Sequence, residues 1–490
     1  MLTENPRHPG ARGRLRAWLA YPLVVPALMA VLVCGIGTQV ACSATIPSWS
    51  NDEPAHLGYV AALAEGRLPT IDTPTVDDPA RFGDLADRMR GWDTAHDHTW
   101  TANHPPLYHL LLVPLWWLSQ GEPDHVFIAM RLLNTLGFAA WVLLVAVIAR
   151  ELVPRRPAVA ALAAVATVTP TLAMRAGFLL NDGFGSSATL LAMLMAIRML
   201  RDRVTPTRVA LAALAGAGAA GTRAPGVLWV AVCTVVLLVA LWRRDGWRTA
   251  VGTSAVVGGV PALATGWFYL RNLSLYGDLT GQGALLEKFE RTPVHGIGDI
   301  PHVPSLVEGV ETTPLLLVAL LVLAPLAALA AARRRDLRID AVWALLVLHA
   351  GATLANIASF LAAGGGFHDR YFMPIAPLLA TWAAIGMLEV GRWRNAGRDR
   401  DRVTATWWSV VLLGWLAGAL VWMERRHVLY PDAPHPVGGA LPVLLVGLAA
   451  LAAALVVVAQ GASPTLGRRR RATAAVAAAA ENDTACAVLD

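Results

Sequence analysis

Acidic side chains that could do acid–base chemistry first occur directly after a long apolar stretch. Asp52 and Glu53 stand in Ser50-Asn51-Asp52-Glu53-Pro54-Ala55-His56. An Asx residue, an acid and a proline in succession predict the start of a helix. The two carboxylates could serve only as a cap and as charges that favour the helix dipole. Alternatively, one of them could act as a general base on a hydroxyl group.

A histidine and another acid also lie next to apolar runs further along the chain. His104 precedes Pro105-Pro106, which predicts a short helix of about 14 residues up to Leu118, better suited to a re-entrant or interfacial helix than to a span. Asp182 lies in Asn181-Asp182-Gly183 between two apolar runs. This tripeptide suits a turn, but an ionisable residue at such a place is equally a candidate functional group.

Three arginines follow in similar positions, namely Arg223 in Gly-Thr-Arg-Ala-Pro-Gly, Arg271 in Tyr-Leu-Arg-Asn, and Arg370, which precedes Tyr371. The planar guanidinium group of arginine presents paired donors that suit a phosphate. The alternative for each is an arginine that snorkels to the membrane surface or forms a structural ion pair. The cluster His96-Asp97-His98 could bind a metal, but loop histidines are usually solvated, so we predict no metal ligand and no cofactor.

The elements that position these residues must be membrane-spanning helices. Hydrophobic residues make up 56% of the 490 residues and charged residues only 15%, where soluble domains carry about 25% charged residues. Apolar runs of about 18 residues or more recur along the chain, and each is long enough to cross a bilayer. The net charge of +6 comes from dispersed arginines, so we predict no nucleic-acid partner. The fold class is an all-helical polytopic bundle with interfacial helices outside the membrane.

We predict about twelve spans, with boundaries near 18–43, 127–149, 157–173, 184–200, 206–221, 226–242, 249–269, 313–332, 340–362, 371–390, 405–423 and 438–460. With residues 1–17 in the cytoplasm, most of the 40 Lys and Arg residues fall on the cytoplasmic side, as the positive-inside rule requires. The candidate site residues then share the outer side of a cell membrane. The transmembrane domain covers 18–460, with long outer loops at 44–104 and 271–312, and 461–490 is a cytoplasmic tail predicted to be disordered.

The ordered set of motifs resembles the C-type superfamily of membrane glycosyltransferases, especially the protein mannosyltransferase and aminoarabinose transferase group. The likeness spans roughly residues 45–375. It is carried by these segments: Asp52-Glu53, His104-Pro105-Pro106-Leu107-Tyr108, Arg131-Leu132-Leu133-Asn134, Asn181-Asp182-Gly183, Tyr269-Leu270-Arg271-Asn272, Tyr276-Gly277-Asp278 and Arg370-Tyr371. It implies a polyprenyl-phosphate sugar as donor and an extracytoplasmic hydroxyl on a glycan, lipid or protein as acceptor. Asn103 stands where some relatives have a carboxylate that helps to hold a metal, so metal dependence is not carried over.

The resemblance also implies roles for individual residues. Asp52, Glu53 and Asp182 are the implied catalytic acids, and the implied substrate-binding residues are His56, His104, Arg223, Arg271, Arg370 and Tyr371. A transporter or flippase is the main alternative, and it calls for ionisable residues at mid-span and broken helices. A scaffold whose site has decayed is a further alternative.

Overall fold

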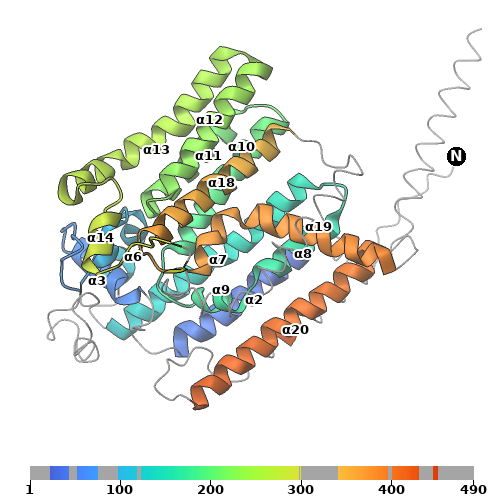
Figure 1. The fold of residues 1–490 in the computed structure, drawn as a ribbon, viewed down its shortest axis with the longest axis horizontal. Coiled ribbons are helices and arrows are strands. Elements are labelled where there is room, and N and C mark those ends of the chain that lie inside the picture. Colours follow the sequence, from blue (N-terminus) through green and yellow to red (C-terminus); the bar gives the residue numbers. More distant parts are fainter. Residues whose placement is uncertain are drawn as a thin grey trace, which may run out of the picture.

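The structure, a computed structural model, describes residues 23–43, 52–75, 98–118, 123–296, 298–299, 340–394, 400–429, 445–447 and 449–450. Throughout these residues the regular structure is helical, apart from one isolated bridge between Pro74 and His98 (Figure 1). The prediction of an all-helical polytopic membrane protein is confirmed. The predicted cytoplasmic segment 1–17, the span 313–332 and the tail 461–490 lie outside the described residues, as does most of the span 438–460.

Within the described part of the chain, eight helical segments are long and apolar enough to cross a bilayer. They are α2 (Val24–Ser43), α7 (Pro123–Leu152), α10 (Asp182–Arg201), α12 (Gly226–Asp245), α13 (Trp247–Tyr276), α18 (Ala341–Ala362), the 3-10 helix η4 (Asp369–Ile375) with α19 (Ala376–Arg394), and α20 (Arg400–Leu429).

One of the predicted spans is divided in the structure. The predicted span 157–173 is wrong as a single helix, because it divides into α8 (Pro157–Thr167) and α9 (Pro170–Arg175). Pro170 disfavours helical geometry in the residue before it, and the Thr169 side chain accepts a hydrogen bond from the Leu172 amide as the cap of α9. The predicted span 206–221 is present as α11 (Pro206–Thr222), whose 17 residues stand at the short end of the range of about 17–25 residues for a spanning helix.

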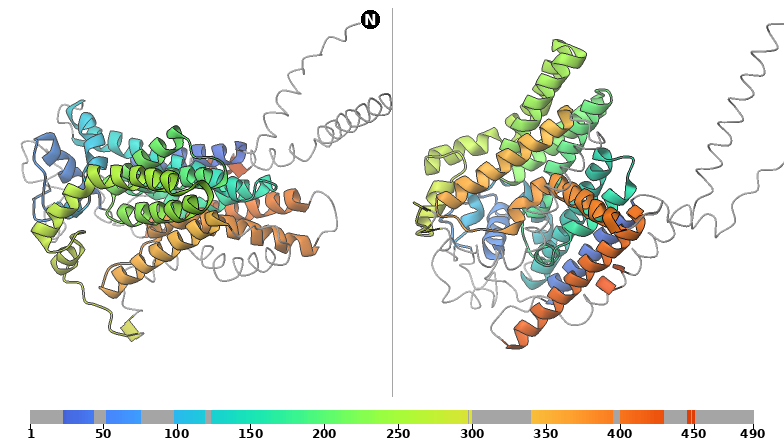
Figure 2. Two further views of the ribbon diagram at one scale, coloured as in Figure 1. Left: turned by 90° about the horizontal axis from the view of Figure 1, so that it is seen from above. Right: turned by 45° about the vertical axis from the view of Figure 1, so that its right-hand side comes forward.

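The helices form two groups that meet at α7 and α10. In one group α11, α12, α13 and α18 pack on one another, and in the other α2, α8, α19 and α20 do so (Figures 1 and 2). Small residues allow close approach in the first group, as where Gly216 faces Pro261 and Val230. This suits a bundle in lipid, where van der Waals packing replaces most of the hydrophobic driving force.

Three short helices stand at the end of the bundle where the two long loops meet. These are α3 (Glu53–Ala64), α6 (Leu107–Leu118) and α14 (Gln282–Lys288), with the 3-10 helix η1 (Trp100–Asn103) between the first two. The predicted helices after Asp52 and after His104 are thus both present. The apolar side of α3 faces the protein, because Leu57 and Val60 are buried against α6 and α7.

Side-chain hydrogen bonds join the two loops at this end. Arg271 Nη2 donates to the carbonyl oxygen of Pro69 at 2.7 Å, and Asn272 Nδ2 donates to that of Asn103 at 2.9 Å. The hydroxyl of Tyr276 accepts a hydrogen bond from the Ile71 amide at 3.1 Å. α13 therefore ends on the first loop and holds it over the bundle.

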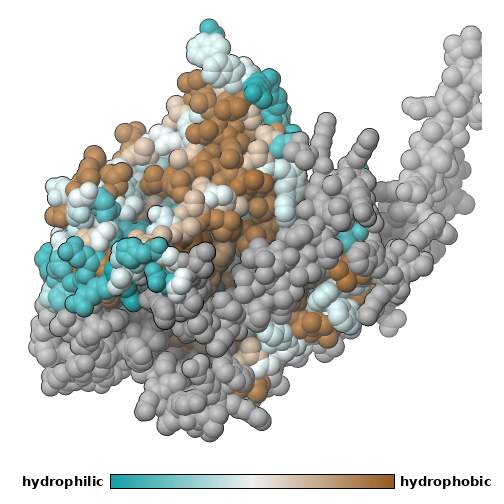
Figure 3. All heavy atoms as spheres, in the orientation of Figure 1, coloured by the Kyte–Doolittle hydropathy of each residue, from teal (hydrophilic) through white to brown (hydrophobic). Residues whose placement is uncertain are grey.

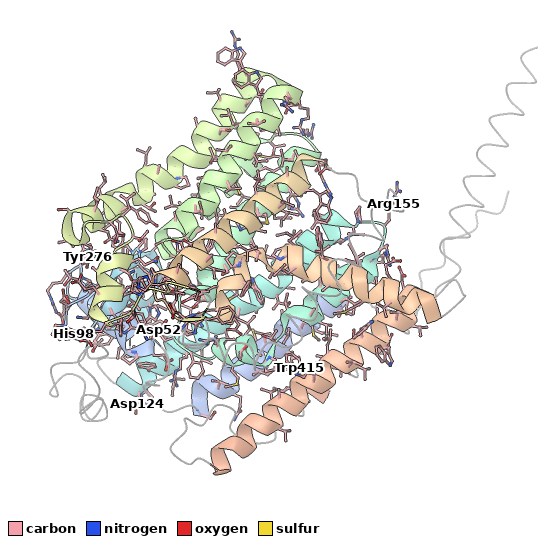
Figure 4. All side chains as sticks on the ribbon, viewed as in Figure 1. Asp52, His98, Asp124, Arg155, Tyr276 and Trp415 are labelled. Carbon is pink, nitrogen blue, oxygen red and sulfur yellow. The ribbon has the colours of Figure 1, made fainter. Side chains whose placement is uncertain are left out.

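The surface separates by polarity along the long helices. On the face shown in Figure 3, hydrophobic side chains cover the middle of the first helix group, and hydrophilic side chains gather at its two ends. Asp52, His98 and Tyr276 lie at one end of the bundle, and Arg155 lies at the opposite end (Figure 4). The candidate site and Arg155, which lies between the predicted spans 127–149 and 157–173 on the predicted cytoplasmic side, therefore occupy opposite ends, as the predicted topology requires.

Candidate active site

Asp52 precedes the first turn of α3 but does not cap it. Its side chain makes no capping hydrogen bond, and its Oδ2 instead lies 2.8 Å from Nη2 of Arg370 in η4. Burial by itself would raise the pKa of Asp52, but nearby positive charge, chiefly that of Arg370, holds that pKa well below its usual value. The carboxylate is thus ionised, partly buried and free of a capping role.

Glu53, the neighbouring acid, points elsewhere. Its two oxygens accept hydrogen bonds from Arg131 Nε and Nη2 at 2.7 and 2.6 Å, and Oε1 also accepts one from the Leu179 amide at 2.7 Å. Both side chains of the ion pair are 0% exposed. Arg131 also donates to the carbonyl oxygen of Ala41 at the end of α2. Glu53 therefore connects α3 to α7, α2 and the segment before α10.

Asp182 opens α10 and binds two arginines from other parts of the chain. It pairs with Arg223, which follows α11, and its Oδ2 lies 3.3 Å from Nη1 of Arg370. The segment before it is fixed by Asn134, whose Nδ2 donates to the Phe178 carbonyl oxygen at 2.6 Å. Arg370 therefore bridges Asp52 and Asp182, and Asp182 bridges Arg370 and Arg223.

Two histidines border this charged group. His56 Nδ1 lies 2.8 Å from Nε2 of His109, and burial lowers the pKa of His56 to about 3 despite the nearby Asp52. His104 ends η1, and burial together with the charge of Arg223 lowers its pKa well below the usual value. Both imidazoles are therefore neutral near pH 7, where they can donate or accept hydrogen bonds.

A cavity of about 1190 Å³ connects these residues with the first helix group. At its polar end it is lined by Asp52, His56, His104, Arg223, His368, Arg370 and Tyr371. From there it continues between α12, α13 and α18, where Leu228, Trp229, Ala262, Ile357 and Phe360 line it. The cavity therefore has a cationic, histidine-rich head and an apolar extension along the membrane-spanning helices.

The head of the cavity contains nitrogen atoms that lack a partner. Within the described part of the chain, Nε of Arg223, Nε of Arg370 and Nδ1 of His104 are buried and have no hydrogen-bond partner. A buried donor without a partner costs about 1–3 kcal/mol. Two guanidinium N–H groups here thus favour an acceptor ligand, and a phosphate oxygen is the acceptor best matched to paired arginines.

The structure brings together six of the nine predicted site residues at the cavity wall: Asp52, His56, His104, Arg223, Arg370 and Tyr371. The other three are placed differently. Glu53 and Asp182 lie behind the wall as ion-pair partners. Arg271 lies on Phe268 and the first loop, with its guanidinium carbon 5.6 Å from the ring centroid.

Sequence reasoning also missed several residues. His368 lines the cavity, and burial and the charge of Arg370 lower its pKa to about 2. Trp100, Asn103, Thr280, Gln282 and Phe289 line the outer part of the cavity from the two loops. His368 adjoins Asp369-Arg370 in the sequence, so its place in that motif was an available signal, whereas nothing local marked the loop residues.

A metal site gains no support from the described residues. No three His, Cys, Asp or Glu side chains come together there as ligands would. The tract His96-Asp97 lies outside the described residues, and His98 lies at the isolated bridge with Pro74. The expectation of no metal and no cofactor stays a prediction.

No family model matches the sequence, and no curated protein matches it. The solved structures that are similar in fold include the following three. ArnT from Cupriavidus metallidurans, bound to undecaprenyl phosphate, is 15% identical with a TM-score of 0.44, over 91% of this chain and 78% of that chain. The oligosaccharyltransferase AglB from Archaeoglobus fulgidus, in complex with an inhibitory peptide and a dolichol-phosphate, is 13% identical with a TM-score of 0.46, over 90% and 56% of the two chains.

The third is the arabinosyltransferase EmbB from Mycobacterium smegmatis, which is 14% identical with a TM-score of 0.39, over 91% of this chain and 41% of that chain. This chain thus spans about half the length of AglB and less than half that of EmbB. At such TM-scores and identities, these similarities assign no activity to the chain. The fold and the site define a polytopic helical membrane protein with a charged cavity at one end of its bundle.

Proposed function

We propose that this protein is a membrane glycosyltransferase that moves a sugar from a polyprenyl-phosphate donor to an extracytoplasmic hydroxyl group of a glycan, lipid or protein. The observation that carries the proposal is the shared cavity of Asp52, Arg223 and Arg370 with an apolar extension between α12, α13 and α18. A polyprenyl chain fits the apolar extension, and its phosphate fits the two arginines.

The donor phosphate also activates the base in this proposal. Arg370 holds Asp52 at 2.8 Å and keeps its pKa far below neutral, although burial alone would raise it. A carboxylate held in this way is a weak base. When a phosphate oxygen binds Arg370, it takes part of the guanidinium charge away from Asp52, and the pKa of Asp52 rises. The base therefore gains strength only in the presence of donor.

The transfer itself needs one base and one stabilised leaving group. Asp52 accepts the proton of the acceptor hydroxyl as its oxygen forms a bond to the anomeric carbon of the sugar. The bond between that carbon and the phosphate oxygen breaks on the opposite face, with inversion. The lipid phosphate leaves with the electron pair, and Arg223 and Arg370 stabilise its charge. Glu53 and Asp182 position Asp52 and the arginines without touching the sugar.

The test is transfer of radiolabelled sugar from a panel of polyprenyl-phosphate sugars in membranes that contain wild type or Asp52→Asn. Loss of the base is expected to slow transfer by about 10²–10⁴-fold at unchanged expression. Transfer that the substitution leaves unchanged would refute Asp52 as the base. If no donor supports transfer by the wild type, the proposal is refuted and the alternative of a transporter or lipid flippase is favoured.

A further inference from the structure

The outer part of the cavity is lined by aromatic and polar side chains, whereas its head is lined by arginines and histidines. Trp100, at the start of η1, and Phe289, directly after α14, both line it. Their ring centroids lie 5.6 Å apart at an angle of 87°. The two aromatic side chains come from different loops, so the site is complete only when the first and second loops meet.

A buried hydrogen-bond acceptor, the side-chain oxygen of Asn103, belongs to the same part of the cavity. Asn103 is only 4% exposed and lines the same cavity. Its Nδ2 donates to the carbonyl oxygen of Thr280 at 3.2 Å, which fixes the orientation of the amide. Within the described residues, its Oδ1 has no hydrogen-bond partner. An amide oxygen can only accept a hydrogen bond. A ligand that pairs with Asn103 Oδ1 must therefore offer a hydrogen-bond donor.

The two ends of the cavity thus call for opposite ligand chemistry. The arginine head offers donors and suits a phosphate, whereas the loop end offers an acceptor, two aromatic faces and the polar side chains of Thr280 and Gln282. A sugar ring has this combination, because its C–H faces pack on aromatic rings while its hydroxyl groups donate hydrogen bonds. A fatty acyl chain leaves Asn103 Oδ1 without a partner, at a cost of about 1–3 kcal/mol.

We propose that Trp100, Phe289 and Asn103 form the binding site for a carbohydrate acceptor. This proposal rests on the proposed glycosyl transfer. The site belongs to the acceptor because its residues lie on the aqueous loops, whereas the lipid-linked donor enters along the apolar extension between α12, α13 and α18. The terminal ring of the acceptor packs on the aromatic pair, and a neighbouring hydroxyl donates to Asn103.

Binding tests this directly on the full-length protein in lipid nanodiscs. Saturation-transfer NMR would measure binding of methyl pyranosides, methyl furanosides and their linked dimers. Trp100→Ala and Phe289→Ala are each expected to weaken saccharide binding by about tenfold, and Trp100→Tyr is expected to retain most of it. The matched control is Trp247→Ala, because Trp247 is an exposed tryptophan at the start of α13. This substitution should leave saccharide binding unchanged.

Binding of undecaprenyl phosphate, with and without an attached mannose, separates the possible outcomes. All variants are expected to bind both lipids as the wild type does, which also shows that they are folded. If Trp100→Ala weakens binding of the mannosylated lipid alone, the aromatic pair holds the donor sugar and the proposal is overturned. It is equally overturned if the wild type binds lipid phosphate but no saccharide, or binds saccharides regardless of Trp100 and Phe289. Failure to bind either lipid would instead count against the proposed function.

Discussion

Replacing Glu53 by glutamine should lower the free energy of unfolding of the protein. The residues that line the cavity should stay in place. Glu53 and Arg131 are fully buried and share two hydrogen bonds of 2.6–2.7 Å. Removing one partner of such a pair leaves a buried charge uncompensated, at a cost of about 3–5 kcal/mol. Glutamine can still accept from the Leu179 amide, so we expect the lower end, about 3 kcal/mol, or roughly a hundredfold in the folding constant.

The assay is unfolding of the purified protein in mixed micelles by increasing SDS, followed by tryptophan fluorescence. Glu151→Gln is the matched control, because Glu151 forms a surface ion pair with Arg198 whose side chains are 30% and 37% exposed. Its loss should cost at most about 1 kcal/mol. The double variant Glu53→Leu/Arg131→Met should recover part of the lost stability, because it removes both buried charges together.

The outcome decides between two roles for Glu53. If the acid is structural, Glu53→Gln loses stability, and the molecules that remain folded retain much of their transfer activity. A variant as stable as the wild type but inactive would refute this reasoning and return Glu53 to the catalytic role implied by the sequence resemblance.

Three further predictions concern the cationic head and the buried histidines. Arg370→Lys keeps the charge but cannot bridge Asp52 and Asp182, so kcat should fall roughly a hundredfold in the radiolabel assay, and an active lysine variant would contradict the bridge. Gly185→Ala places a methyl group 3.1–3.2 Å from the Arg223 side chain and should weaken binding of undecaprenyl phosphate several-fold without any change in charge; unchanged affinity would show that Arg223 can shift freely. Burial lowers the pKa of His56 to about 3 from about 6.5 when unfolded, so between these values only the unfolded chain binds the proton. Stability should therefore fall as the pH drops below about 6.5 and stay level above about 7. His56→Phe should flatten this slope in thermal unfolding between pH 4 and 8, and an unaltered slope would show that other groups cause it.

Much of the fold could be predicted because it follows from local sequence. Apolar length identified the long helices, and the helix starts at Asp52 and after His104 could be predicted from capping residues and prolines. The break between α8 and α9 depends on Pro170, whose effect the apolar run concealed. The extent of α11 agrees with the predicted span 206–221 to within one residue.

The site was harder to predict because its contacts are not local. Arg131 reaches Glu53 across 78 residues, and Arg370 reaches Asp182 across 188. Spacing along the chain contains no information about such pairs. Arg271 has the same residue type and the same predicted side of the membrane as Arg223, yet it binds carbonyl oxygens of the first loop. Only the packing of α13 against that loop distinguishes the two.

Helix geometry explains why adjacent charged residues divide their roles. Successive residues in a helix point about 100° apart, so the two members of an adjacent charged pair can contact different parts of the protein. In Asp52-Glu53 the first faces the cavity and the second anchors α3 to Arg131. In Asp369-Arg370 the first residue is the anchor, because Asp369 binds Arg175 and Thr171. The second residue faces the cavity, where Arg370 binds Asp52 and Asp182. A charged pair at a helix start is therefore better understood as one reacting group and one anchor than as two catalytic residues, and the anchor holds the reacting group at a fixed distance from its partners.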